Sequence, residues 1–114
     1  MMKWIIAGTR TFNDYNLLTE VCNQHISSSD EIVSGTAKGA DRLGEAYAID
    51  NKLDLKRFPA DWEQFGKRAG YLRNVQMGEY ADAAIIFWDG QSKGAQHMIN
   101  IMKNLNKPYY IITY

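Results

Sequence analysis

Short apolar runs alternate with longer amphipathic segments along this chain, a pattern that is typical of α/β domains. Residues 4–7 and 83–88 are continuous apolar runs, as expected of central strands that are buried on both faces of a parallel sheet. Residues 32–33, 53–58 and 109–113 predict three further strands. The segment 53–58 alternates apolar and charged residues, so we expect it nearer the edge of the sheet.

Helices are predicted between the strands wherever apolar residues recur at helical spacing. Asp14 and Ser92 stand where they can cap the first and the last of these helices. The four predicted helices cover residues 14–25, 41–49, 71–80 and 92–105. The remaining segment, residues 60–70, is predicted to be a long connection that holds Trp62 and Phe65 among charged residues.

Five strands that alternate with four helices predict an α/β fold, a Rossmann-like three-layer sandwich. Its parallel sheet is covered on both faces because right-handed crossovers place the helices outside it. The predicted strand order is 3-2-1-4-5. In that order the chain reverses direction between the first and the fourth strand, and a crevice opens there at the carboxyl edge. With 114 residues and no repeat or linker, the chain is predicted to form a single domain, 1–114.

Three glycine-containing loops follow predicted strands, so we expect them to meet at the carboxyl edge of the sheet. Glycine lets backbone N–H groups approach a ligand closely, and a helix start adds partial positive charge, so phosphate is the expected guest. A tight turn with an N-cap is the structural alternative. The ligand-binding residues predicted in these loops are Gly8, Thr9, Arg10, Phe12, Ser34, Gly35, Thr36, Lys38, Gly39, Asp41, Asp89, Gly90, Ser92, Lys93 and Gly94.

Two arginines are candidates for holding an anionic group of the ligand. Arg10 lies just beyond the first strand, where its guanidinium could grip a phosphate or carboxylate through two hydrogen bonds. Arg73 and its neighbour Asn74 lie in the third predicted helix and are the other candidates. Each has a plain alternative, either a surface arginine or a solvated turn. Acidic residues share these segments, so a mixed site is expected rather than a purely cationic one.

Carboxylates at the same edge supply the candidates for chemistry. Asp41 and Glu45 are one helical turn apart, and Asp89 ends the fourth strand. Carboxylates beside a sugar can accept its hydroxyls or stabilise the transition state of glycosidic cleavage, so these three are the catalytic candidates. The alternatives are a favourable interaction of Asp41 with the helix dipole and an ion pair of Glu45 with Arg42 or Lys38.

The composition of the chain limits which binding partners and which cellular compartment are expected. The 13 basic residues balance the 13 acidic ones, which argues against nucleic acid or an anionic membrane as a partner. Cys22 is the single cysteine, which excludes an internal disulfide and suits a cytoplasmic location. No signal peptide or membrane-spanning run is predicted. Neither a metal site nor a cofactor is predicted from the histidine and cysteine positions.

Residues along nearly the whole chain carry a resemblance to one family. They are the 8–12 loop with Tyr15, the 34–41 loop, Pro59-Ala60-Asp61-Trp62, Gly66-Lys67, Ala69-Gly70, Arg73-Asn74, Met77, Ala81-Asp82 and the 88–94 segment. This set resembles the YspA, cpYpsA-related family of the SLOG superfamily, named for the Smf/DNA-processing protein and the Lonely guy enzymes. The chain departs from the family pattern at Thr36, where a second glycine is usual, and at Ala95, where a threonine is usual.

The resemblance implies a Rossmann-like fold that binds nucleotides or nucleotide-derived ligands. Some relatives are sensors in bacterial and phage conflict systems, whereas Lonely guy enzymes are phosphoribohydrolases that cleave the N-glycosidic bond of nucleoside monophosphates. We therefore expect a sensor, carrier or sequestering module, with a phosphoribohydrolase as the alternative and single-stranded DNA binding third. Whether the chain is an enzyme stays open at this point. The aromatic residues near the sheet ends favour a homo-oligomer, since a second copy could cover them.

Overall fold

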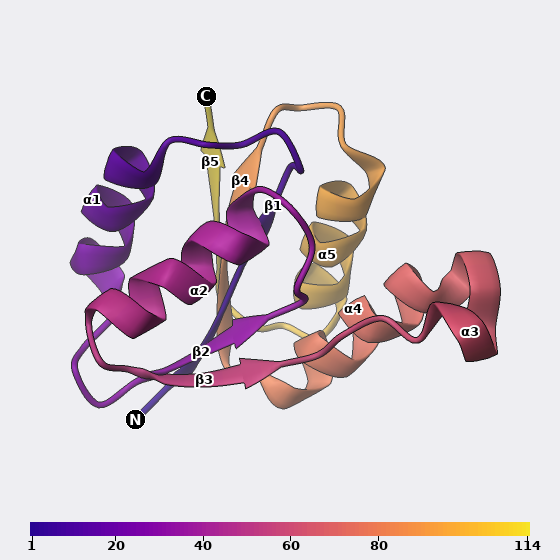
Figure 1. The fold of residues 1–114 in the computed structure, drawn as a ribbon, viewed down its shortest axis with the longest axis horizontal. Helices are drawn as coiled ribbons and strands as arrows, with labels where there is room; N and C mark the ends of the chain where they lie inside the picture. The colour runs from indigo at the N-terminus through magenta and orange to yellow at the C-terminus, as the bar shows by residue number, and fades with distance from the viewer.

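Five parallel strands form one sheet in the order β3-β2-β1-β4-β5 in the computed structural model, which describes residues 1–114 (Figure 1). The predicted fold class, strand order and strand positions are therefore confirmed. Each strand pairs with its neighbours in parallel register, from Trp4 opposite Ile32 on one side of β1 to Trp4 opposite Ala83 on the other. The strands are β1 Lys3–Gly8, β2 Glu31–Ser34, β3 Asp54–Arg57, β4 Ala83–Trp88 and β5 Tyr109–Thr113.

Four main helices complete the three layers, as predicted (Figure 1). Helices α1 (Tyr15–His25) and α2 (Ala40–Asp50) cover one face of the sheet, and α4 (Ala69–Tyr80) and α5 (Lys93–Asn104) cover the other. Asp14 caps α1 by accepting a hydrogen bond from the Leu17 N–H at 3.0 Å. None of the helices combines the length and the apolar character that a membrane crossing requires.

The sheet separates two apolar cores. Alternate residues of β1 and β4 point to opposite faces, so Ile6 and Ile85 pack toward α1 and α2, whereas Ile5 and Ile86 pack toward α4 and α5. All four side chains have no exposed surface. This burial on both faces explains why the two central strands are uninterrupted apolar runs.

The segment 60–70 differs from the predicted connection because it contains two short helical elements. These are α3 (Trp62–Phe65) and the 3₁₀ turn Gly66–Arg68, which lie at the outer end of the molecule and lead into α4 (Figure 1). Asp61 caps α3 by accepting a hydrogen bond from the Gln64 N–H at 3.1 Å. One helical turn is too short to produce the apolar spacing by which the longer helices were predicted.

Asp30 ties the start of β1 to the loop before β2. Its carboxylate accepts hydrogen bonds from the Met2 N–H at 2.8 Å, the Ser27 N–H at 2.9 Å and the Trp4 Nε1–H at 3.1 Å. Burial alone would raise the pKa of Asp30, but these hydrogen bonds outweigh it and hold the pKa below its ordinary value. The ionised carboxylate therefore stabilises the fold.

We expect Asp30→Ala to lower the free energy of unfolding by about 2 kcal/mol at pH 7, because three donors lose a charged acceptor. Since the pKa of Asp30 is depressed in the folded state, this stabilisation is present above the ordinary carboxyl pKa and is lost as the pH falls through the folded value. Urea unfolding at pH 7 and at about pH 3 measures both effects. Asp54→Ala removes an exposed carboxylate and is the control, and an equal loss in that variant would contradict the assignment.

Candidate functional site

Two loops meet at the carboxyl ends of β1 and β4, where the strand order reverses. The Thr9 N–H donates to the Phe87 carbonyl at 2.9 Å, which extends the pairing of the two strands. The Asp89 N–H donates to the Thr9 Oγ1 at 3.1 Å and joins the loop after β4 to the loop after β1. The two loops therefore form the two sides of one crevice, as the strand order predicted.

Glycines at two positions allow these loops to pack closely. Gly8 has a φ of +155°, and a Cβ atom there would lie 2.1 Å from the Phe87 carbonyl oxygen. Gly39 has a φ of +79°, and a Cβ atom there would lie 2.4 Å from the Thr9 carbonyl oxygen. Both contacts are with backbone, so no side-chain movement relieves them. The loop before α2 is thus brought against the loop after β1.

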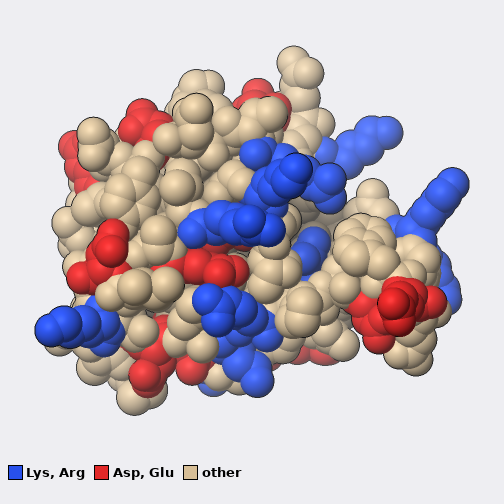
Figure 2. Space-filling model, in the orientation of Figure 1, with Lys and Arg blue, Asp and Glu red and all other residues tan.

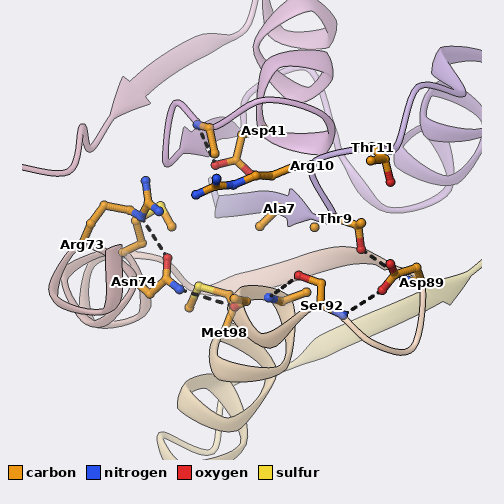
Figure 3. A pocket seen from close by; sticks show the side chains of 15 residues that line it. Ala7, Thr9, Arg10, Thr11, Asp41, Arg73, Asn74, Asp89, Ser92 and Met98 are labelled. Carbon is orange, nitrogen blue, oxygen red and sulfur yellow. Dashed lines mark hydrogen bonds between the residues drawn. The ribbon is translucent and has the colours of Figure 1, made fainter. Parts of the chain in front are cut away.

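A cavity of about 340 Å³, which we call the inner cavity, opens between these loops (Figure 3). Its wall combines a small apolar part, mostly from β1, α4 and α5, with polar side chains from the loops, from the start of α2 and from α4. Ser92 caps α5 by accepting from the Ala95 N–H at 3.4 Å, so the start of that helix faces the cavity. The lining residues are Ala7, Gly8, Thr9, Arg10, Thr11, Ala37, Asp41, Arg73, Asn74, Met77, Asp89, Ser92, Gly94, Ala95 and Met98.

Arg73 and Asn74 reach the inner cavity from α4 and link it to two other elements. Arg73 donates from Nε to the Asn74 Oδ1 at 2.9 Å and from Nη1 to the Gly35 carbonyl. Asn74 in turn lies 3.5 Å from the Gly94 carbonyl, to which its Nδ2 donates. In Figure 3 the Arg10 side chain extends across the cavity toward Arg73. Two guanidinium groups therefore face one space from opposite sides.

Asp41 is the buried carboxylate of the inner cavity, with 4% of its surface exposed. Its Oδ2 accepts a hydrogen bond from the Ala37 N–H at 3.2 Å. Burial raises the pKa of Asp41 to about 6, and the nearby Glu45 adds to the rise, although the Ala37 amide and Arg73 oppose it. Burial also lowers the pKa of Arg73, and Arg10 adds to that effect against the pull of Asp41. Keeping both Asp41 and Arg73 charged in this buried position therefore costs desolvation free energy.

The other two carboxylates predicted for chemistry already accept hydrogen bonds within the chain. Glu45 does not line the inner cavity, because its Oε2 accepts from the Ser34 hydroxyl at 2.6 Å and its Oε1 pairs with the Arg57 Nε at 3.0 Å. Asp89 lies exposed at the rim, where its Oδ1 accepts from the N–H groups of Gln91 and Ser92, both at 2.8 Å. These hydrogen bonds hold the pKa of Asp89 below its ordinary value.

Several predicted ligand-binding residues lie outside the inner cavity. Phe12 is 2% exposed and stacks on Phe87 in the core, with ring centroids 4.7 Å apart. Ser34 is buried beneath its loop, and Gly39 packs against backbone. Gly90 and Lys93 line a shallow hollow on the outer side of α5. Those that do line the inner cavity are Gly8, Thr9, Arg10, Asp41, Arg73, Asn74, Asp89, Ser92 and Gly94.

The apolar part of the cavity wall was missed by the sequence reasoning. Met77 and Met98 lie on the buried faces of α4 and α5, and Ala7 ends the apolar run of β1. Apolar residues at such positions normally indicate core, so their periodicity carries no sign of a ligand. Only Ala7, near the carboxyl end of β1, carried a signal that could have been used. No group of three His, Cys, Asp or Glu side chains is placed to hold a metal ion.

Parallel strands in this order, with a cavity at the point where the order reverses, define a Rossmann-like α/β domain. The chain belongs to the YspA, cpYpsA-related SLOG family, whose sequence profile matches residues 2–65. Membership implies in general that the ligand is nucleotide-derived. The match contains the first two glycine loops, whereas Arg73, Asn74 and the start of α5 lie beyond it.

One curated relative is a phage protein. The chain is 32% identical over 108 residues to the Gene 61 protein of Mycobacterium phage D29, and the match covers 85% of each chain. No solved structure gives a significant match. The comparisons therefore identify the family, and the assignment of the site depends on the geometry of the inner cavity.

Proposed function

We propose that this protein binds a nucleotide or nucleotide-derived ligand in the inner cavity and acts as a sensor, carrier or sequestering module. The observation that carries the proposal is the meeting of Arg10, Arg73 and the start of α5 around one cavity at the switch point of the sheet. Two guanidinium groups and a helix N-terminus together attract an anion. A nucleotide phosphate is the anion that the family relationship favours.

The wall of the inner cavity suits the two parts of a nucleotide that carry polar groups. The phosphate is proposed to lie against Arg10 and the first amides of α5, beside Gly94 and Ala95, where no bulky side chain blocks approach. The ribose hydroxyls are proposed to donate to Asp41 or Asp89, which face the same space from the start of α2 and from the loop after β4. Hydrogen bonds to charged acceptors would then fix the orientation of the sugar.

Phosphoribohydrolase activity is a second candidate because Asp41 faces the cavity and has a pKa of about 6. A raised pKa suits a group that exchanges a proton during glycosidic cleavage. However, Glu45 is engaged by Ser34 and Arg57 and does not line the inner cavity, so α2 supplies Asp41 alone to that space. Incubation with nucleoside monophosphates, followed by chromatography, tests this activity. We expect nucleotide binding without the appearance of free base. Release of free base in molar excess over the protein would instead establish that the protein is an enzyme.

Arg10→Ala is expected to weaken nucleotide binding about tenfold, because the phosphate loses a charged donor. Isothermal titration calorimetry against the 5′-monophosphates of the four common nucleosides measures the effect. Arg68→Ala is the control, since Arg68 is an exposed arginine that lines neither the inner cavity nor its surroundings. Unchanged affinity in Arg10→Ala would remove Arg10 from the site. Absence of binding of both the 5′-mono- and the 5′-diphosphates by the unsubstituted protein would refute the proposed function.

A further inference from the structure

A second hollow adjoins the inner cavity on the side of α3. This outer hollow also has a volume of about 340 Å³, and Arg10, Ala37 and Arg73 line both spaces. Its other side is formed by the loop before α2 and by Pro59, Ala60 and Trp62. The two guanidinium groups thus stand at the boundary, where a bound molecule could contact them from either space.

The outer hollow is lined by cationic side chains and by no acidic one. Lys38 and Arg42 face it together with Arg10 and Arg73, whereas the inner cavity contains Asp41 and Asp89. Figure 2 shows Lys and Arg side chains gathered on the face between the start of α2 and the α3 segment. The whole chain has a net charge of zero, so this excess of positive charge is local.

Three of these cations, Arg10, Lys38 and Arg42, form no ion pair within the chain. The single salt bridge of the structure joins Arg57 to Glu45, and no hydrogen bond occupies the side-chain donors of Arg10, Lys38 or Arg42. Like charges that share one hollow repel one another, which costs free energy unless an anion separates them. The donors are therefore free to bind a ligand that carries more than one negative charge.

Trp62 closes the outer hollow on its far side. Its side chain contacts the α4 segment next to Arg73, since a Cβ atom on Gly70 would lie 3.5 Å from the Trp62 ring and 3.6 Å from the Arg73 Nη2. Trp62 is 53% exposed, although a large apolar side chain on a short helix would ordinarily be covered. The indole thus forms a wall of the hollow that is open to an occupant.

We infer that the outer hollow binds a second phosphate group, so that the ligand is a nucleotide with a pyrophosphate group rather than a nucleoside monophosphate. This inference rests on the proposed function, which places the first phosphate in the inner cavity. The pyrophosphate group extends between Arg10 and Arg73 into the outer hollow, where Lys38 and Arg42 hold the second phosphate. Two phosphates joined by one bridging oxygen match two adjacent spaces that share a cationic boundary.

The test compares the 5′-mono- and 5′-diphosphates of adenosine, guanosine, cytidine and uridine by calorimetry at one fixed salt concentration, because salt screens exposed charges. We expect the preferred diphosphate to bind at least about tenfold more tightly than its monophosphate. In the double variant Lys38→Gln, Arg42→Gln, affinity for the diphosphate should fall about tenfold and affinity for the monophosphate less than about twofold. Both side chains are exposed, so the variant is expected to fold.

The control is the double variant Lys52→Gln, Lys103→Gln, which makes the same change in charge at exposed positions away from both spaces. Equal affinity of the unsubstituted protein for mono- and diphosphates would overturn the inference and leave the proposed function intact. An equal effect of Lys38→Gln, Arg42→Gln on both ligands, or no effect on either, would also overturn it. Failure of every monophosphate and diphosphate to bind would instead refute the proposed function.

Discussion

Arg73→Gln is expected to weaken nucleotide binding by about 3 kcal/mol, or roughly a hundredfold, the largest loss of affinity from any single substitution in the site. Arg73 is positioned for its role, because the Asn74 Oδ1 and the Gly35 backbone carbonyl accept its hydrogen bonds and hold the guanidinium between the two spaces. Glutamine keeps polarity but removes the charge and the planar fork. The substitution also removes the opposite charge that lowers the pKa of the buried Asp41, so that pKa rises further.

A double-mutant cycle separates the effect on the ligand from the effect on Asp41. Arg73→Gln alone should lower both the affinity and the midpoint of thermal unfolding. Adding Asp41→Asn removes the uncompensated carboxylate, so it should restore stability without restoring affinity. Arg68→Gln, at an exposed position, is the control. If Arg73→Gln cost no further affinity in the Asp41→Asn background, Arg73 would act only by neutralising Asp41 and not by contacting the ligand.

The fold was predictable from the sequence because strands that are buried on both faces are recognisable as continuous apolar runs. The continuous apolar runs that became β1 and β4 have side chains in two different cores, and nothing polar could be accommodated on either face. Alternation of strands and helices then leaves few topologies, since parallel crossovers are right-handed. The strand order followed, and with it the meeting of the loop at Gly8 with the loop at Asp89.

The site was less predictable, because side-chain direction depends on tertiary contacts. Phe12 follows a glycine loop, yet it turns into the core and stacks on Phe87. Glu45 lies one helical turn from Asp41, yet its partners come from β2 and β3, the strands packed beneath α2. Sequence spacing gives the face of a helix but not which neighbour satisfies a carboxylate.

Thr36 shows how the structure explains a departure from the family pattern. Its φ of 64° lies in the left-handed region, where a glycine carries no strain and a β-branched residue does. The Thr36 N–H donates to the Ser34 hydroxyl at 3.0 Å, which holds the turn. The glycine usual in the family at this position is therefore explained by backbone conformation, and the chain keeps the same turn with a threonine.

Asp41→Asn is expected to raise the free energy of unfolding by about 3 kcal/mol at pH 7 and to weaken nucleotide binding. Burial raises the pKa of Asp41 from an ordinary value of 3.8 to about 6 in the folded state. The folded protein therefore binds this proton more tightly than the unfolded chain. The resulting stabilisation is full below about pH 4 and is lost as the pH rises through about 6. Asparagine keeps an oxygen for the Ala37 amide but has no charge to desolvate.

Urea unfolding of both proteins between pH 4 and 7 isolates this group, because every other titrating residue is present in each. The gain from Asp41→Asn should be near zero at pH 4 and grow toward pH 7. Asp89→Asn is the control, since hydrogen bonds lower the pKa of Asp89 and its substitution should give no gain at pH 7. A gain independent of pH would contradict the desolvation of Asp41. A stabilising substitution that weakens binding would show that this buried carboxylate is retained for the ligand and not for the fold.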